Sequence, residues 1–168
     1  MTLQAIDLNS IPPDVQIGND EGIEMRWAEA AVKYSSTIDK LLVAAGRRSL
    51  DHLHRFRFTP IDNDIYKKFR GLFPEMDVCH LDVAKLKSPE EKQKWYFILE
   101  SWKTALKEYN TGTLIRVDAE KPFGPTNSCV VPRSQFYCIE IARCREAIND
   151  KYVLDVIEGR QELMTLDD

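Results

Sequence analysis

One stretch of this chain, residues 113–149, constrains the fold more than any other part of the sequence. Residues 113–117 are rich in β-branched side chains and predict a strand. A loop with two prolines and a glycine, residues 120–127, joins it to a second short strand predicted at residues 128–131. The segment that follows, residues 133–149, carries three arginines and two glutamates in an otherwise apolar run. Plain core helices rarely hold so many charges, so we expect a functional site here.

The charged segment has two possible periodicities. As a helix, it places Tyr137, Ile141, Cys144 and Ile148 in one narrow stripe, at steps of four, three and four. As a strand, it would alternate Tyr137, Ile139 and Ile141 with the residues between them. The helical interpretation explains more residues, and we therefore predict a helix.

Two roles fit the charges on that helix. They can form a semi-buried ion-pair network that stabilises the fold, or a recognition face with arginines and an aromatic anchor. Spacing alone favours the network and leaves the recognition face open. The candidates for contact with a partner are these residues: Arg133, Gln135, Phe136, Glu140, Arg143, Arg145 and Glu146.

Apolar spacing predicts further elements before this segment. Steps of three and four from residue 20 onward indicate an amphipathic helix that stops at Gly46. Residues 47–60 are ambiguous between a short helix and an alternating strand. Asp62 is a candidate cap for a second helix, which Pro74 would end. A short strand is then expected at residues 76–81.

The helix with the strongest start signal comes next. Ser88-Pro89-Glu90-Glu91 is a capping box with proline at the first helical position. The apolar stripe that follows predicts a helix over residues 89–109, with Gly112 as its stop. At the other end of the chain, residues 152–166 predict a weaker helix interrupted at Gly159.

These elements define one α+β domain, predominantly helical with a small antiparallel β-sheet or hairpin, over residues 20–166. Residues 1–19 are expected to form an extended or disordered arm. A net charge of -4 argues against a broad nucleic-acid surface, and no apolar run is long enough for a membrane span. The first residues lack the features of a secretory signal, so we expect a cytoplasmic protein, acting as a monomer.

Cysteine spacing gives no metal motif. The chain contains four cysteines: Cys79, Cys129, Cys138 and Cys144. None forms a Cys-x-x-Cys pair, and the default is reduced thiols in the core. His80, His52 and His54 could add ligands, but no spacing matches a standard zinc finger or ribbon. We expect neither a metal nor a cofactor.

Catalytic motifs are also missing from the sequence. It contains no G-x-x-x-x-G-K-[ST] phosphate loop, no G-x-G-x-x-G after a strand, no G-x-S-x-G elbow and no H-E-x-x-H pair. We therefore expect a protein that is not an enzyme.

Several segments, in order, resemble one family, the eukaryotic polysaccharide biosynthesis domain containing proteins. The resemblance runs from about residue 18 to residue 149. Two departures are a longer stretch around residues 44–52 and the missing acidic tail of animal members. The matching pieces are Gly18-Asn19-Asp20, Ile23-Glu24-Met25, Trp27-Ala28, Ile65-Tyr66, Phe69-Arg70, Phe73, Leu86-Lys87-Ser88, Lys94-Trp95, Tyr109-Asn110, 112–118, Pro132-Arg133, Gln135-Phe136, 139–143, Arg145-Glu146 and Asn149.

The resemblance to the short eukaryotic members implies a small cytosolic chaperone dedicated to newly made translation elongation factor 1-alpha. Such a protein would shield the GTP-binding domain of its client until that domain folds. The same domain grouping includes plant xylan-modifying methyltransferases that use S-adenosylmethionine. A transferase of polysaccharide metabolism is therefore the alternative.

Overall fold

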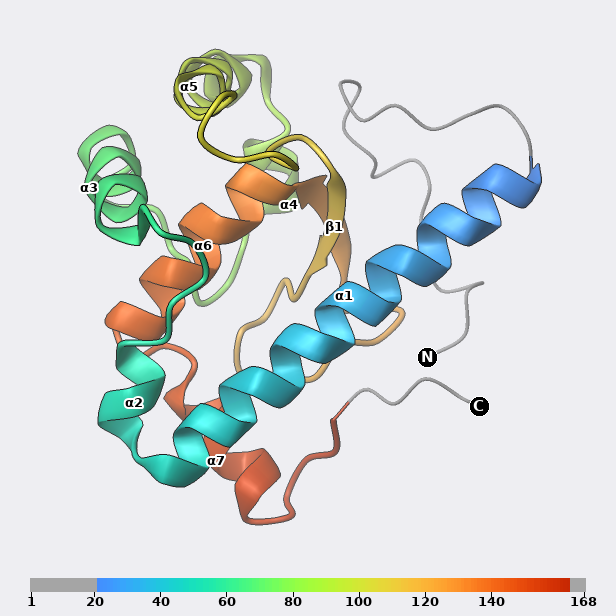
Figure 1. Ribbon diagram of the computed structural model, residues 1–168, viewed down its shortest axis with the longest axis vertical. Helices are drawn as coiled ribbons and strands as arrows, with labels where there is room; N and C mark the ends of the chain where they lie inside the picture. Colours follow the sequence, from blue (N-terminus) through green and yellow to red (C-terminus); the bar gives the residue numbers. More distant parts are fainter. Residues whose placement is uncertain (1–20, 164–168) are drawn as a thin grey trace.

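The computed structural model describes residues 21–163, in which one helix, α6, passes through the middle of the protein (Figure 1). The predicted arm at residues 1–19 and the end of the predicted terminal helix, residues 164–166, lie outside the described residues. In chain order the elements are α1 (Glu21–Arg48), α2 (Leu50–His54), α3 (Asp62–Leu72), α4 (Val83–Leu86), α5 (Pro89–Ser101), β1 (Gly112–Ile115), β2 (Cys129–Pro132), α6 (Arg133–Arg145) and α7 (Asp150–Ile157). The prediction of a mainly helical α+β domain is confirmed.

The predicted hairpin is present as a two-stranded antiparallel sheet. Thr113 of β1 pairs with Val131 of β2, and every residue of both strands is buried. Leu114 and Val130 pack against Ala31 of α1, so α1 covers one face of the hairpin. The hairpin therefore belongs to the core and exposes neither face.

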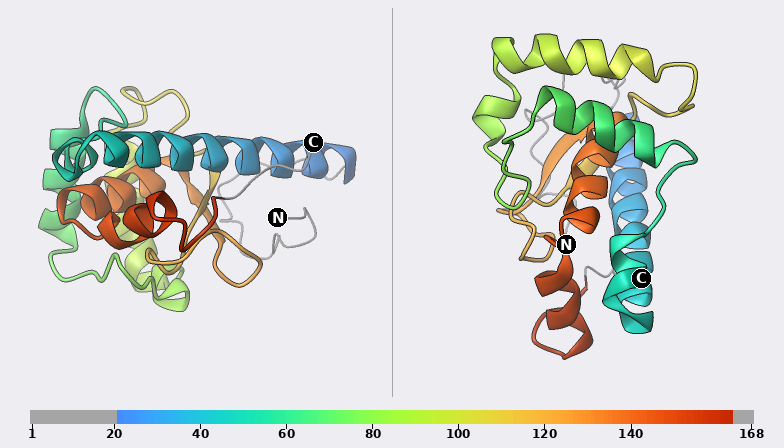
Figure 2. Two further views of the ribbon diagram at one scale, coloured as in Figure 1. Left: turned by 90° about the horizontal axis from the view of Figure 1, so that it is seen from below. Right: turned by 90° about the vertical axis from the view of Figure 1, so that its left-hand side faces the viewer.

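The charged segment is helical, and α6 starts directly where β2 ends. Pro132 is the N-cap residue, because its fixed φ suits the entry to a helix while its missing N–H is no loss there. Figures 1 and 2 show α6 between α1 on one side and α3 and α5 on the other. The helix contacts both strands, α2, α3 and α5. Of its thirteen residues, only Tyr137 and Arg145 are not buried.

The helix predicted at residues 89–109 begins as expected and ends early. Ser88 is the N-cap, and its Oγ accepts a hydrogen bond from the Glu91 N–H at 3.3 Å. The helix ends at Ser101, so the predicted end was wrong. Turns carry the chain onward, and the Leu106 N–H still donates to the Trp102 carbonyl at 2.9 Å. These turns keep Trp102 and Leu106 buried and four residues apart, as a helix would. The apolar stripe alone therefore predicted a helix that was too long.

Gly46 does not stop the first helix, which continues to Arg48. A Cβ atom at Gly46 would lie 2.3 Å from Cγ1 of Val153 in α7. The glycine therefore allows α1 and α7 to pack closely, and the prediction of a helix stop was wrong. Figure 1 shows α7 beside the C-terminal end of α1, and the two helices are in contact.

The ambiguous segment after α1 contains the short helix α2, with Ser49 as its N-cap. Asp62 is the first residue of α3 and not its cap, which corrects the prediction. Its buried carboxylate instead accepts the N–H groups of Phe58 and Thr59, both at 2.8 Å. Asp62 thus holds the preceding loop.

Three smaller predictions have mixed outcomes. The strand expected at residues 76–81 is reduced to one antiparallel bridge between His80 and Asp118. The terminal helix α7 ends before Gly159, which has a φ of 78° that favours glycine. Three cysteines are buried as expected, but Cys79 is only half-buried. No helix among residues 21–163 is both long enough and apolar enough to cross a membrane.

Candidate functional site

Five of the seven candidate residues point into the protein. Their side chains leave at most a few per cent of their surface exposed: Arg133 6%, Gln135 6%, Phe136 2%, Glu140 2% and Arg143 0%. Arg145 is exposed and Glu146 is half-buried, both at the C-terminal end of α6. A partner could therefore reach Arg145 and Glu146 without opening the domain, whereas the other five face inward.

The inward charges form a hydrogen-bonded network. The two carboxylate oxygens of Glu140 accept from Arg143 Nη1 at 2.8 Å and from Asn149 Nδ2 at 3.1 Å. Arg116, which follows β1, donates from Nη2 to Asn149 Oδ1 at 2.8 Å. Burial alone raises the pKa of Glu140, but the guanidinium groups of Arg143 and Arg116 hold that pKa below its ordinary value. Glu140 is thus a buried carboxylate that stays ionised.

Arg143 also connects α6 to two loops. Its Nε donates to the Val78 carbonyl at 2.6 Å, and its Nη2 donates to the Arg116 carbonyl at 2.7 Å. Planar guanidinium forks suit such multiple contacts, because their donors are held in fixed directions. The buried arginine therefore sets the position of the chain before His80 and of the chain after β1.

Arg116 also connects the network to a second buried group, Tyr152 and Asp39. The guanidinium of Arg116 lies over the ring of Tyr152, 4.1 Å from its centroid. The Tyr152 hydroxyl donates to Asp39 Oδ2 at 2.7 Å, which links α7 to α1. Burial raises the pKa of Asp39 to about 6, opposed by the nearby charge of Arg116. Asp39 is thus a buried carboxyl whose ionised form is disfavoured.

Arg133, the first residue of α6, has a different set of partners. Its Nε donates to Thr113 Oγ1 and its Nη1 donates to Glu108 Oε2, both at 2.8 Å. Its guanidinium lies 3.5 Å from the ring centroid of Tyr34. Beside it is a surface hollow of about 290 Å³, whose lining includes Trp27 and Glu108. Arg133 thus supports the wall of this hollow from inside.

Glu146 serves mainly to hold α3 against the end of α6. Its carboxylate accepts from the Tyr66 hydroxyl at 2.9 Å and from Arg70, whose Nε and Nη2 donate at 2.8 Å and 2.6 Å. Burial alone would raise the pKa of Glu146, but these hydrogen bonds hold it below its ordinary value. Among the seven candidates, Arg145 is therefore the residue most available to a partner.

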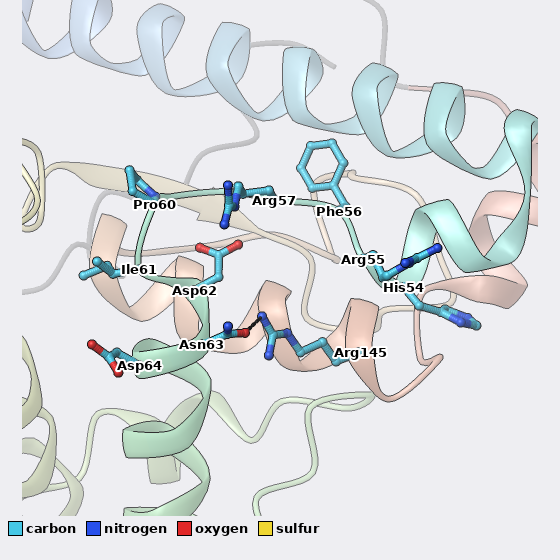
Figure 3. A pocket seen from close by; sticks show the side chains of 10 residues that line it. All are labelled: His54, Arg55, Phe56, Arg57, Pro60, Ile61, Asp62, Asn63, Asp64 and Arg145. Atoms are coloured by element: carbon cyan, nitrogen blue, oxygen red, sulfur yellow. Dashed lines mark hydrogen bonds between the residues drawn. The ribbon is translucent and has the colours of Figure 1, made fainter.

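Arg145 lies at one side of a groove of about 620 Å³ on the surface (Figure 3). The other side is the loop between α2 and α3, where Arg55 and Arg57 are exposed. Arg145 Nη2 donates to Asn63 Oδ1 at 2.7 Å across the groove, as the dashed line in Figure 3 marks. The full lining is His54, Arg55, Phe56, Arg57, Pro60, Ile61, Asp62, Asn63, Asp64 and Arg145.

We call this feature the arginine groove. It combines cationic side chains with half-exposed apolar ones, Phe56 and Ile61, as protein-binding surfaces often do. Sequence reasoning identified Arg145 and missed the side chains of the α2–α3 loop. Their only signal was the alternation Arg55-Phe56-Arg57-Phe58, which suggested a strand. In the structure the alternation places the two arginines outward and the two aromatic rings against each other, with centroids 4.8 Å apart.

The fold and these contacts define a class of small α+β domain, in which a charged helix is buried under a helical shell. The chain belongs to the PBDC1 protein family, whose model matches residues 23–154. This confirms the family resemblance that the sequence motifs indicated.

Relatives in animals and fungi match most of this chain. Protein PBDC1 of Mus musculus is 36% identical over 140 residues, which are 83% of this chain and 67% of that protein. Protein PBDC1 of Homo sapiens is 33% identical over 150 residues, 89% of this chain and 62% of that protein. The chain thus spans about two thirds of the length of these animal relatives. The Protein PBDC1 homolog of Saccharomyces cerevisiae is 35% identical over 136 residues, 79% of this chain and 89% of that protein.

A solved structure has the same fold. The solution NMR structure of protein yst0336 from Saccharomyces cerevisiae superposes with a TM-score of 0.68 at 34% sequence identity. The match covers 81% of this chain and 92% of the yeast chain.

Proposed function

We propose that this protein is a chaperone for newly synthesised translation elongation factor 1-alpha, which it binds in the cytoplasm as a monomer. The protein would shield the GTP-binding domain of the client until that domain has folded. The observation that carries this proposal is membership of the PBDC1 family. The sequence resembles the short eukaryotic members of that family, and this resemblance implies the role.

The arginine groove is the surface that we assign to the client. A chaperone that must release its client needs an accessible surface of moderate apolar content with charged groups around it. Phe56 and Ile61 supply the apolar part, while Arg57 and Arg145 supply exposed charge. Exposed arginines outnumber the exposed carboxylate of Asp64 in this lining, so the groove favours a client segment that carries acidic side chains next to apolar ones.

The rigid base under the groove supports this assignment. Arg145 belongs to α6, whose other side is fixed by the buried network of Arg143 and Glu140. The facing loop is held by the carboxylate of Asp62. Both sides are therefore positioned before a client arrives, which lowers the entropy lost on binding.

No feature of the described residues favours the transferase alternative. Within residues 21–163, the one strand that leads directly into a helix does so through Pro132 and Arg133, not through a glycine-rich turn. The Ser134 N–H at that helix start already donates to the Tyr109 carbonyl at 2.8 Å. We therefore propose no second function.

The test is capture of nascent chains. Ribosomes translating elongation factor 1-alpha are incubated with the tagged protein, and the bound nascent chains are identified. We expect the wild-type protein to retain chains that contain the GTP-binding domain. The double variant Arg57→Glu/Arg145→Glu should retain them about 10-fold less or worse, because it reverses two charges of the groove.

The matched control is Lys67→Glu/Lys92→Glu, which reverses two exposed charges, on α3 and α5, outside the groove. It should leave capture and the thermal midpoint unchanged. If the wild type retains no more elongation factor 1-alpha than an unrelated nascent chain, the chaperone proposal is wrong. If the double variant keeps its midpoint and still binds normally, the groove is the wrong surface.

A further inference from the structure

Three side chains that are unrelated to the arginine groove converge at the surface beside the hairpin. His80 Nε2 lies 4.0 Å from Cys79 Sγ and 3.8 Å from Asp118 Oδ1. One ligand atom from each of the three residues lies within 4.8 Å of the others. We infer that Cys79, His80 and Asp118 form a binding site for a divalent cation of the zinc class.

The spacing of the three atoms is close to what a bound zinc ion needs. Zinc bonds sulfur at about 2.3 Å, and imidazole nitrogen and carboxylate oxygen at about 2.0–2.1 Å. Tetrahedral angles then place neighbouring ligand atoms about 3.3–3.6 Å apart. The two distances from His80 Nε2, 4.0 Å and 3.8 Å, exceed this by less than an ångström. The third pair, Cys79 Sγ and an Asp118 oxygen, lies within 4.8 Å, and changes of side-chain torsion can close these gaps.

The backbone holds the two ligand-bearing segments side by side. His80 and Asp118 form an antiparallel bridge. The Leu81 N–H donates to the Val117 carbonyl at 2.9 Å, and the Ala119 N–H donates to the Cys79 carbonyl at 2.8 Å. The ligands therefore come from paired segments and not from two independent loops.

The buried network fixes both segments from below. Arg143 donates to the Val78 carbonyl at 2.6 Å, one residue before Cys79. It also donates to the Arg116 carbonyl at 2.7 Å, two residues before Asp118. Folding therefore already brings the three ligands close together, and a preorganised site binds its ion more tightly.

Asp77 orients two of the ligands, Cys79 and His80. Its Oδ1 accepts the N–H groups of Cys79 and His80 at 2.8 Å and 3.0 Å. Its Oδ2 lies 3.8 Å from Nδ1 of His80, the ring nitrogen that the ion would not use. Metal-bound histidines commonly direct their second nitrogen at a carboxylate, which fixes the tautomer and makes the ligand more basic.

The donor set indicates the kind of ion. One thiolate, one imidazole and one carboxylate suit zinc, whereas magnesium and calcium prefer oxygen ligands alone. Three protein ligands leave the fourth tetrahedral position to water, and the His80 side chain is 63% exposed, so an ion can enter from solvent. Lys121 competes for the carboxylate, with Nζ 3.8 Å from Asp118 Oδ2. The ion would use Oδ1, whose other lone pair already accepts the Glu120 N–H at 2.9 Å.

The test is a titration of the full chain, without a histidine tag and under reducing conditions. Zinc is added in competition with a chromophoric chelator, and cobalt(II) is used separately as a spectroscopic probe. We expect one equivalent of zinc to bind and to raise the thermal midpoint. Cobalt should give a thiolate charge-transfer band together with the intense visible bands of a tetrahedral site.

Substitutions then identify the ligands. Cys79→Ser should remove the charge-transfer band, and His80→Asn and Asp118→Asn should each abolish stoichiometric zinc binding. Asp77→Asn should weaken zinc binding by about 10- to 100-fold, as loss of an orienting carboxylate does. Circular dichroism checks that each variant is folded. His52→Asn alters an exposed histidine whose Nδ1 is 2.7 Å from Ser49 Oγ, and it should have no effect.

Two results would overturn the inference. The first is a wild-type protein that binds no stoichiometric zinc at micromolar concentration. The second is a zinc affinity that survives in folded Cys79→Ser and His80→Asn variants, because the ion would then be held elsewhere.

Discussion

Arg143 donates a hydrogen bond from Nη1 to Glu140 Oε1 at 2.8 Å, and both side chains are buried within α6. The pair lies one helical turn apart and faces the centre of the domain, where the remaining donors of Arg143 reach two loop carbonyls. Charges that a sequence would normally place at the surface therefore connect the parts of this core.

The first prediction concerns removal of the buried carboxylate. Glu140→Gln should destabilise the domain by about 3–5 kcal/mol, because Arg143 and Arg116 are then buried without their shared anionic partner. Urea unfolding followed by circular dichroism measures the change. Glu100→Gln, on the exposed face of α5, is the control and should stay within about 0.5 kcal/mol of wild type. An equally small effect at Glu140 would mean that the network does not stabilise the fold.

The same network shows why the sequence predicted the elements better than the directions of their side chains. The hairpin and α6 follow from β-branched runs, a proline- and glycine-containing loop and apolar spacing, all of which are local. Arg143 looks like a surface residue by type, and its burial depends on the carbonyls of Val78 and Arg116, distant in sequence, as well as on Glu140. The spacing of the charges therefore suggested an ion-pair network, but it could not show whether that network faces the core or the solvent.

Two other features could not be predicted from local sequence patterns. Trp102 and Leu106 keep helical spacing in turns, so a periodic pattern could not reveal that α5 had ended. Asp118 lies next to Cys79 and His80 only because two distant segments pair. No cysteine or histidine spacing could have indicated that contact.

The second prediction is a pH dependence that comes from Asp39. The pKa of this carboxyl is about 6 in the folded protein and 3.8 in an ordinary environment. Between these values the folded state binds more protons than the unfolded state, so the contribution to stability is greatest below the lower value and is lost as pH rises through about 6. Burial, the largest cause of the shift, disfavours the ionised form.

Asp39→Asn tests this directly, because an amide keeps an acceptor for the Tyr152 hydroxyl and does not titrate. The free energy of unfolding of the wild type, relative to the variant, should fall between about pH 4 and about pH 7. Urea titrations at several pH values measure this difference, in which the other carboxylates cancel. A constant difference across the range would show that Asp39 has the same pKa folded and unfolded.

The third prediction contrasts two glycines. A Cβ atom at Gly112 would lie 2.3 Å from Cζ2 of the Trp27 ring, so Gly112→Ala should destabilise the domain by about 1–3 kcal/mol. At Gly71, an exposed position in α3, a Cβ atom would meet no heavy atom within 4 Å. Gly71→Ala should therefore stabilise by about 0.5–1 kcal/mol through helix propensity. Thermal unfolding measures both, and a Gly112→Ala variant as stable as the wild type would contradict the close packing of Trp27 on Gly112.

The fourth prediction separates two neighbouring residues at the end of α6. Glu146 accepts from Tyr66 and from two nitrogens of Arg70, so Glu146→Ala should destabilise the domain by about 1.5–3 kcal/mol. Arg145 is exposed and donates to Asn63, itself exposed, so Arg145→Ala should change stability by less than about 0.5 kcal/mol. Urea unfolding of the two variants provides the comparison.

A double-mutant cycle with Arg70→Met tests whether Glu146 links α6 to α3 through Arg70. Because Glu146 and Arg70 share two hydrogen bonds, the double variant should be less destabilised than the sum of the single variants, with a coupling of about 0.5–3 kcal/mol. Arg145→Ala combined with Arg70→Met should show a much smaller coupling, since Arg145 bonds Asn63 and touches the network only through the Tyr66 ring, 5.3 Å from its guanidinium. Strong coupling at Glu146 with weak coupling at Arg145 would mean that Glu146 holds α3 in place through Arg70. Additivity at both positions would instead remove the ion pair of Arg70 and Glu146 as the link between α3 and α6.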